Sequence, residues 1–298
     1  MATPRQRTLT TSDGVRLAVQ EHGDPAHPTV VAIHGYPDDH HVWDGVVAAL
    51  VDRFHVVTYD VRGAGSSESP SGRRHYTIPR LAADLGEVID GVVGDRQVHL
   101  LAHDWGSIQT WALVTDPAWA DRLLSYTSVS GPDLDMVGVW LRGVRERPRA
   151  IARQLLDSYY IALFQLPLLP EAAIRLGVLD RLVRHSARHG LSADAPVRDK
   201  SRSDAERGLA LYRANFLPRL ARPAPRRTTV PVQVLAPTGD LHVDSETQRT
   251  APAPWCDSLA THEVEGNHWV VEHSPALVAA HVSRFVDENS GKADRPLF

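Results

Sequence analysis

The chain has 298 residues, of which 43% are hydrophobic and 23% are charged, as in an ordinary globular protein rather than a disordered or fibrous one. The 32 Lys and Arg against 36 Asp and Glu give a net charge of -4, which argues against a nucleic-acid partner. A single cysteine, Cys256, excludes an intrachain disulfide and a cysteine-based zinc site.

Hydropathy gives two further expectations about location. No stretch approaches 18 consecutive apolar residues, so we expect no membrane span. Residues 1–11 carry arginines but no apolar core of a secretory signal, so we expect a cytoplasmic protein.

Strands and helices alternate in the first part of the chain. Residues 6–11 and 15–20 flank Asp13-Gly14, a pair typical of a two-residue hairpin turn. Short apolar runs typical of buried strands follow at residues 29–33, 55–59, 98–102 and 124–129. Helical patterns separate them at residues 43–51, 78–92 and 107–114. This alternation predicts an α/β fold with a mostly parallel central sheet and an N-terminal antiparallel hairpin.

The alternation stops after the sixth predicted strand. Residues 133–222 contain amphipathic helical stretches interrupted by prolines and no convincing strand. Strand patterns resume at 232–236 and 258–264, and a closing helix is expected over 275–287. We therefore predict one core, residues 1–132 and 223–298, with a helical cap (lid) inserted at 133–222.

A strand-to-helix junction carries the first candidate for chemistry. Ala102 and Gly106 lie two positions on either side of Asp104, which is the small-x-nucleophile-x-small pattern of a nucleophile elbow. Such a turn exposes the central side chain next to helix N-terminal amides, which stabilise an anion. A carboxylate there suits attack on an sp³ carbon and an ester intermediate better than acyl transfer. The structural alternative is that Asp104 only caps the helix.

These features together resemble a known family. The strands, elbow and insertion resemble the α/β-hydrolase fold, and residues 103–106 (His-Asp-Trp-Gly) resemble the elbow of epoxide hydrolases and haloalkane dehalogenases. Residues 34–37 (His-Gly-Tyr-Pro) match the H-G-x-P motif of epoxide hydrolases, and residues 60–66 resemble a glycine-rich loop of the family. The resemblance covers residues 15–286 and is strongest to the hydrolase half of actinobacterial proteins that fuse an epoxide hydrolase to a short-chain dehydrogenase.

The resemblance implies an oxyanion hole and a triad. The backbone N–H groups of Tyr36 and Trp105 would stabilise the negative oxygen that forms when water attacks the Asp104 ester. In this fold the nucleophile, the acid and the histidine follow in that order, so His268 would be the general base and Asp240 would orient it. The alternatives for the acid are Asp133 and Asp135, after the sixth strand, and Asp244.

Two tyrosines complete the implied site. Residues 158–165 and 209–215 resemble the two lid segments that supply paired tyrosines, which places Tyr160 and Tyr212 as proton donors to the epoxide oxygen. Tyr159 is the alternative to Tyr160, and both tyrosines could instead pack as ordinary aromatic residues. Expected substrate-binding residues are His34, Tyr159, Phe164 and Trp269, although His34 is also suited to hydrogen-bonding neighbouring backbone.

The resemblance therefore implies an epoxide hydrolase without cofactor or metal. It would convert an apolar epoxide to a vicinal diol through an ester on Asp104. The expected partners are a small-molecule epoxide and, as a possible homodimer, a second copy of the chain. The alternative is a haloalkane dehalogenase with the same nucleophile, although that family usually has Asn or Glu where Tyr36 stands.

Overall fold

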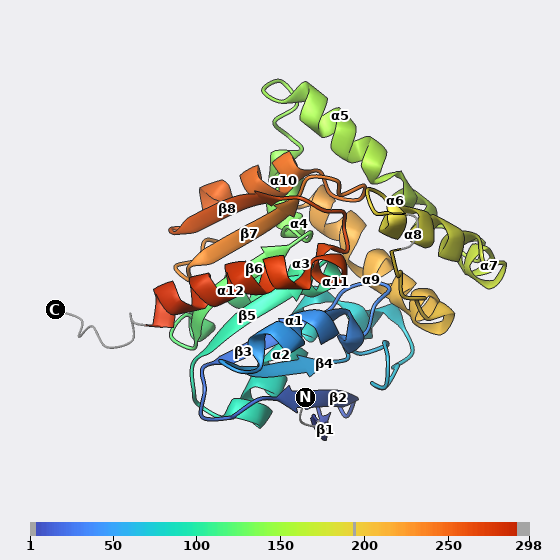
Figure 1. Ribbon diagram of the computed structural model, residues 1–298. Helices are drawn as coiled ribbons and strands as arrows, with labels where there is room; N and C mark the ends of the chain where they lie inside the picture. Colours follow the sequence, from blue (N-terminus) through green and yellow to red (C-terminus); the bar gives the residue numbers. More distant parts are fainter. Residues whose placement is uncertain (1–3, 193–194, 291–298) are drawn as a thin grey trace.

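The computed structural model describes residues 4–192 and 195–290, and its centre is an eight-stranded sheet with helices on both faces (Figure 1). The strand order is β1-β2-β4-β3-β5-β6-β7-β8. The first two pairings, β1 with β2 and β2 with β4, are antiparallel, and the others are parallel. The strands are Arg5–Thr10, Arg16–His22, Thr29–Ile33, His55–Tyr59, Val98–His103, Leu123–Val129, Val232–Pro237 and Leu259–Val264. The predicted fold class is confirmed.

The strands form where apolar runs can be buried on both faces. Every residue of β3 and β4 is buried, and both strands have the bounds expected from the sequence. β5 and β6 each extend one residue beyond the prediction. Because parallel strands are covered on both faces, continuous apolar runs identify them better than alternation does.

The hairpin turn differs from the prediction. Thr10 pairs with Arg16, and the Thr11 N–H donates to the Val15 carbonyl at 2.9 Å, so the loop is longer than two residues. Gly14 has φ of 85°, and its N–H donates to the Thr11 carbonyl. This is the geometry of a three-residue hairpin loop that ends in a left-handed glycine. The Asp-Gly pair therefore identified the hairpin correctly but gave the wrong loop length.

Helices cover the two faces of the sheet (Figure 1). One face carries α1 (Asp44–Leu50), α11 (Val270–His273) and α12 (Pro275–Ser290), and the other carries α2 (Ile78–Val93) and α3 (Trp105–Val114). The remaining core elements are α10 (Ser245–Thr250) and short 3₁₀ helices at His40–Trp43, Arg73–Tyr76, Pro117–Trp119 and Ala253–Trp255. No helix within the described part of the chain is long and apolar enough to cross a membrane.

The elements that the structure describes between β6 and β7 are helices joined by loops. They are α4 (Leu134–Trp140), α5 (Pro148–Asp157), α6 (Tyr159–Phe164), α7 (Leu169–Arg175), α8 (Val178–Arg188) and α9 (Arg202–Ala221). We call residues 133–222 the helical segment. Tyr212 and Phe216 of α9 pack edge-on against Trp105, the first residue of α3. This contact places the helical segment over the junction where β5 ends.

Candidate active site

Asp104 occupies a sharp turn between β5 and α3. Its φ of 51° is uncommon for a residue other than glycine, and such strain tends to occur at functional sites. The turn is held in place because the Asp104 N–H donates to the Val129 carbonyl at 3.0 Å and the Asp104 carbonyl accepts from the Ile108 N–H at 2.9 Å. The carboxylate lines two cavities beneath the helical segment.

A backbone amide lies against one oxygen of this carboxylate. The Tyr36 N–H donates to Asp104 Oδ1 at 2.6 Å. A Cβ at position 35 would overlap that same oxygen and would lie 2.6 Å from the Trp105 nitrogen. Gly35 is therefore required for close approach of the loop to Asp104 and Trp105.

His268 lies between two carboxylates. Its Nδ1 is 3.0 Å from Asp240 Oδ2, and its Nε2 is 3.5 Å from Asp104 Oδ2. Burial disfavours the charged imidazole, but the two carboxylates outweigh it and raise the pKa of His268 to about 10. Burial of Asp240 opposes its ionisation, yet the charge of His268 holds the pKa of Asp240 below its usual value.

The alternative acids have other partners. Asp133 accepts from the Met136 N–H at 2.8 Å as the N-cap of α4, and Asp135 pairs with Arg219. Asp244 caps α10 and lies 3.0 Å from Arg153. Of the four acids considered from the sequence, Asp240 is the one in hydrogen-bonding contact with the His268 ring.

Tyr160 and Tyr212 lie over Asp104 and line the same two cavities with it. Their ring centroids are 6.1 Å apart in an edge-on arrangement. Burial, together with the charge of Asp104, raises the pKa of both phenols above the usual value, so both carry their protons at neutral pH. A hydrogen bond between the phenols partly opposes this shift at Tyr160.

The other expected site residues divide into two groups. The larger of the two cavities beside Asp104 is lined by Phe164, Trp269 and Tyr159. Tyr159 is 63% exposed and lies at the edge of this cavity. His34 lines neither cavity of Asp104, because its Nδ1 faces the Gly35 carbonyl at 2.9 Å and its Nε2 accepts from the Val61 N–H. We therefore do not place His34 among the substrate-binding residues.

The two cavities share a boundary at the carboxylate. One of about 200 Å³ extends from Asp104 towards α6 and α8, where Leu179, Leu182 and Ser186 line it. The other, of about 90 Å³, has a mainly apolar lining that includes Ile108 and Leu134. Asp104 therefore has space for apolar groups on two sides.

His242 is a site residue that the sequence analysis missed. It lines both cavities, and its ring lies edge-on to His268 at 4.8 Å and to Tyr160 at 5.5 Å. Burial and the neighbouring charge of His268 lower the pKa of His242 to about 4, so it is neutral at neutral pH. Its Nε2 lies 2.8 Å from the hydroxyl of Ser186. Its position two residues after Asp240 was the available signal.

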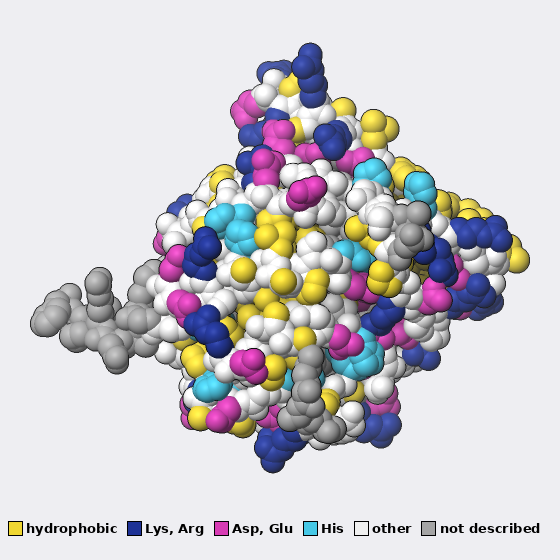
Figure 2. Space-filling model, viewed as in Figure 1, with side chains coloured by type: hydrophobic (Ala, Val, Ile, Leu, Met, Phe, Trp, Pro, Cys, Tyr) yellow, Lys and Arg dark blue, Asp and Glu magenta, His cyan; other side chains and the backbone are white. Residues whose placement is uncertain are grey.

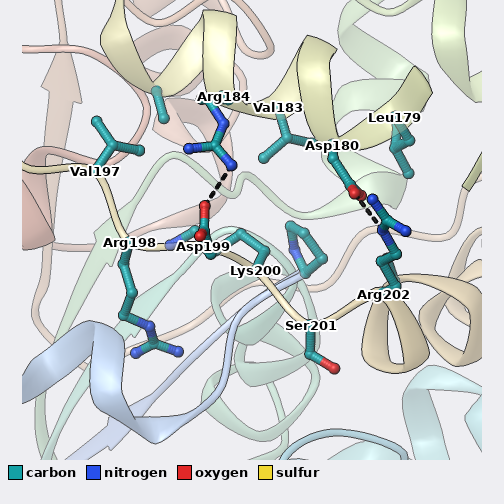
Figure 3. Close-up of a pocket in the computed structure, with 13 residues that line it drawn as sticks. Leu179, Asp180, Val183, Arg184, Val197, Arg198, Asp199, Lys200, Ser201 and Arg202 are labelled. Atoms are coloured by element: carbon teal, nitrogen blue, oxygen red, sulfur yellow. Dashed lines mark hydrogen bonds and ion pairs between the residues drawn. The ribbon is translucent and has the colours of Figure 1, made fainter. Parts of the chain in front are cut away.

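A separate cavity of about 220 Å³ lies between α8 and residues 197–202 (Figure 3). Its lining is rich in charged groups, but these groups pair with each other: Arg184 with Asp199, and Asp180 with Arg202. Lys200 pairs with Asp38 and Glu272 of the core. Because these cations are already neutralised, this cavity is a less suitable anion site than its composition suggests.

Comparisons with known proteins agree with this architecture. A family model for the alpha/beta hydrolase fold matches residues 28–275. The chain is 35% identical over 305 residues to the probable oxidoreductase EphD of Mycobacterium tuberculosis, covering 96% of this chain and 50% of that protein. It is 38% identical over 135 residues to epoxide hydrolase A of the same species, covering 45% of this chain and 41% of that protein. The chain thus spans about half the length of the curated relatives it matches first.

Solved structures show the same fold. A structure from a study of epoxide hydrolases in metagenomes from hot environments matches with a TM-score of 0.76 and 23% identity, over 95% of this chain and 99% of that one. The epoxide hydrolase of Bacillus megaterium matches with a TM-score of 0.75 and 22% identity, over 94% of this chain and all of that one. The family model covers most of this chain. The chain belongs to the α/β-hydrolase fold family.

Proposed function

We propose that this protein is an epoxide hydrolase that converts an apolar epoxide to a vicinal diol through an ester on Asp104. The observation that carries the proposal is the pair of protonated phenols that line one cavity with Asp104, Tyr212 being buried and Tyr160 partly buried. When an epoxide ring opens, its oxygen becomes an alkoxide, which leaves readily only if a proton donor is present. The two phenols supply that donor beside the nucleophile Asp104.

The first step is ring opening. Asp104 Oδ1 is held by the Tyr36 N–H, so Oδ2 is the attacking atom. It forms a bond to an epoxide carbon as the bond from that carbon to the ring oxygen breaks. The electron pair moves to the ring oxygen, which takes a proton from Tyr160 or Tyr212.

The second step is hydrolysis of the ester. Asp240 holds His268, which takes a proton from water while the water oxygen attacks the Asp104 carbonyl carbon. The Tyr36 N–H, with that of Trp105, stabilises the resulting oxyanion. Before the water attacks, the tyrosinate left by ring opening takes the proton that His268 carries in the resting enzyme. As the intermediate collapses, the departing alkoxide takes the proton that His268 received from water, and the new carboxyl group of Asp104 returns its proton to His268. The products are the diol and the free enzyme.

Isotope labelling tests this order of bonds. A single turnover of styrene oxide in heavy-oxygen water should place the label in Asp104, detected by mass spectrometry of the peptide, while the first diol stays unlabelled. Label in that first diol would show direct attack by water and would overturn the mechanism. Release of halide from a haloalkane without diol formation from epoxides would favour a dehalogenase instead.

Variants separate the two steps. Asp104→Asn should abolish diol formation, because the amide is a poor nucleophile. His268→Gln should accumulate the ester, seen as an increase in protein mass equal to that of the substrate. A His268→Gln enzyme that turns over at the wild-type rate would contradict the role of this histidine.

Three further expectations complete the proposal. The helical segment would act as the cap that closes the site, which its contacts with Trp105 support. The chain would be similar to the hydrolase half of proteins that fuse an epoxide hydrolase to a short-chain dehydrogenase, consistent with its match to half of EphD. The cytoplasmic location and the homodimer stay predictions from the sequence.

A further inference from the structure

Exposed apolar side chains are concentrated in the helical segment. Among the described residues, 14 large hydrophobic side chains are more than a third exposed, and 12 of these lie between residues 133 and 222. The most exposed are Leu168 at 79%, Leu176 at 75% and Leu156 at 73%. Figure 2 shows hydrophobic side chains along the outline that runs from α5 to α7. Soluble proteins rarely leave such a surface without a partner.

Six of these leucines lie on or next to three helices of the segment, α5, α7 and α8. Leu155 and Leu156 lie in the last turn of α5, Leu168 precedes α7, and Leu169 begins it. Leu176 follows α7, and Leu182 lies on α8. Each of the helices α5 to α8 contacts the next one along the chain. We call the surface defined by these six leucines the outer leucine face.

Positive charge accompanies the leucines. The helical segment has 16 Lys and Arg against 10 Asp and Glu, a net charge of +6, so the rest of the chain carries -10. Arg149 lies seven residues before Leu156 on α5, and Arg181 lies three residues after the exposed Val178 on α8. These spacings put each pair on one face of its helix. Both arginines are exposed and form no ion pair with the described residues. Apolar and cationic side chains on one helix face are typical of helices that lie in a membrane interface.

The outer leucine face also adjoins the entrance to the proposed site. Tyr159 and Leu182 are exposed at the surface and at the same time line the larger cavity of Asp104. A molecule that enters this cavity between α6 and α8 therefore passes the edge of the outer leucine face.

We propose that the outer leucine face docks on the surface of an anionic lipid bilayer. Anionic headgroups attract the arginines, and the leucines enter the boundary between headgroups and acyl chains. Charge disfavours a second copy as the occupant, because two segments of net charge +6 would repel each other. Delivery of an apolar epoxide from the bilayer to Asp104 would follow, and this consequence rests on the proposed function.

Vesicle flotation tests the docking without any substrate. The wild-type protein should float with vesicles of phosphatidylglycerol and phosphatidylcholine in equal amounts, and should not float with phosphatidylcholine alone. High salt should weaken the binding, because screening shortens the range of the attraction. The double variants Leu168→Ser/Leu176→Ser and Arg149→Glu/Arg181→Glu should each lower the partition coefficient by about tenfold or more.

A matched control lies on the core helix α12. Leu277 and Arg284 are also exposed, so Leu277→Ser/Arg284→Glu removes the same kinds of group away from the outer leucine face and should leave binding unchanged. If the proposed function holds, all variants should hydrolyse a dissolved epoxide at the wild-type rate. Whether or not it holds, all variants should keep the wild-type melting temperature.

Three results would overturn the inference. The first is no binding, or equal binding, to the two kinds of vesicle. The second is a control variant that loses as much binding as the variants of the face. The third is a wild-type dimer in sedimentation velocity that Leu168→Ser/Leu176→Ser dissociates, since this would assign the face to a second copy. None of these results depends on epoxide hydrolysis, so failure of the docking and failure of the proposed activity are distinguishable.

Discussion

The charge of Asp104 controls the protonation of His268. Two carboxylates flank this imidazole, and together they raise its pKa to about 10 in spite of burial. A protonated His268 cannot accept a proton from water. In the proposed mechanism, ester formation removes the charge of Asp104, so the pKa of His268 falls and its proton can pass to the tyrosinate just before a base is required.

Asp104→Asn should reproduce that loss of charge and lower the pKa of His268 below its wild-type value. The amide has nearly the shape of the carboxylate but no negative charge 3.5 Å from Nε2. Titration of the imidazole nitrogens by NMR measures the change. Asp244→Asn is the control, because Asp244 pairs with Arg153 rather than with His268. An unchanged pKa in Asp104→Asn would contradict this coupling.

Gly35→Ala should reduce the turnover number by about 100-fold or more, the cost of losing an oxyanion donor. The new Cβ would overlap the Asp104 carboxylate, so the loop and its Tyr36 N–H would have to move away. Rapid-quench kinetics should show the larger loss in ester hydrolysis, where the oxyanion forms. A variant with normal hydrolysis and the wild-type melting temperature would show that this donor is not needed.

The sequence predicted the site where short motifs coincide with strand ends. Asp104, Asp240 and His268 each follow a strand of the sheet, and parallel strands bring their carboxyl ends to one edge. His242 lies in the same loop as Asp240 after β7, but no motif marks it as a site residue. Its burial depends on Tyr160 and Ser186, which belong to helices far away in the chain.

At the scale of elements, strands were easier to predict than the connections between them. The runs that became β3 and β4 are buried at every residue, as is typical of central parallel strands covered on both faces. The hairpin loop depends on hydrogen bonds between Thr11, Gly14 and Val15, which the Asp-Gly signal does not specify. The six helices between β6 and β7 depend on mutual packing, so their bounds could not be predicted from periodicity alone.

A buried ion cluster attaches the chain before α9 to the core. Lys200 Nζ lies 2.5 Å from Asp38 Oδ1 and 2.8 Å from Glu272 Oε2. Burial opposes the ionisation of Asp38, but Lys200 outweighs it and lowers the pKa of Asp38 to about 2. The second oxygen of Asp38 accepts from the Trp269 indole at 2.9 Å, which connects this cluster to the residue after His268.

Lys200→Met should lower the free energy of unfolding by about 3 kcal/mol at pH 7, because it leaves Asp38 charged and buried without its cation. Asp38 stabilises the wild-type fold above its ordinary pKa of 3.8, and this contribution is lost as the pH falls through about 2. The difference between the two proteins should therefore narrow in acid. Urea denaturation at several pH values measures it.

Arg202→Met is the matched control for this cluster. Arg202 pairs with Asp180 at the surface (Figure 3), with 60% of its side chain exposed. Exposed pairs contribute little, so the loss should stay below about 1 kcal/mol and should depend little on pH. Equal losses in the two variants would show that the burial of Lys200 is not what makes its pairing strong.

At the scale of the whole molecule, the proposed site lies where the helical segment meets the sheet, with a cavity on either side of Asp104. An epoxide with an apolar group on each ring carbon fits this arrangement, whereas a terminal epoxide leaves one cavity empty. Leu134→Phe should therefore lower kcat/KM for trans-stilbene oxide by about tenfold or more and for 1,2-epoxyhexane much less. Val197→Phe fills the separate cavity of Figure 3 and should change neither value. Equal losses for both epoxides in Leu134→Phe would show that the smaller cavity does not hold a substituent.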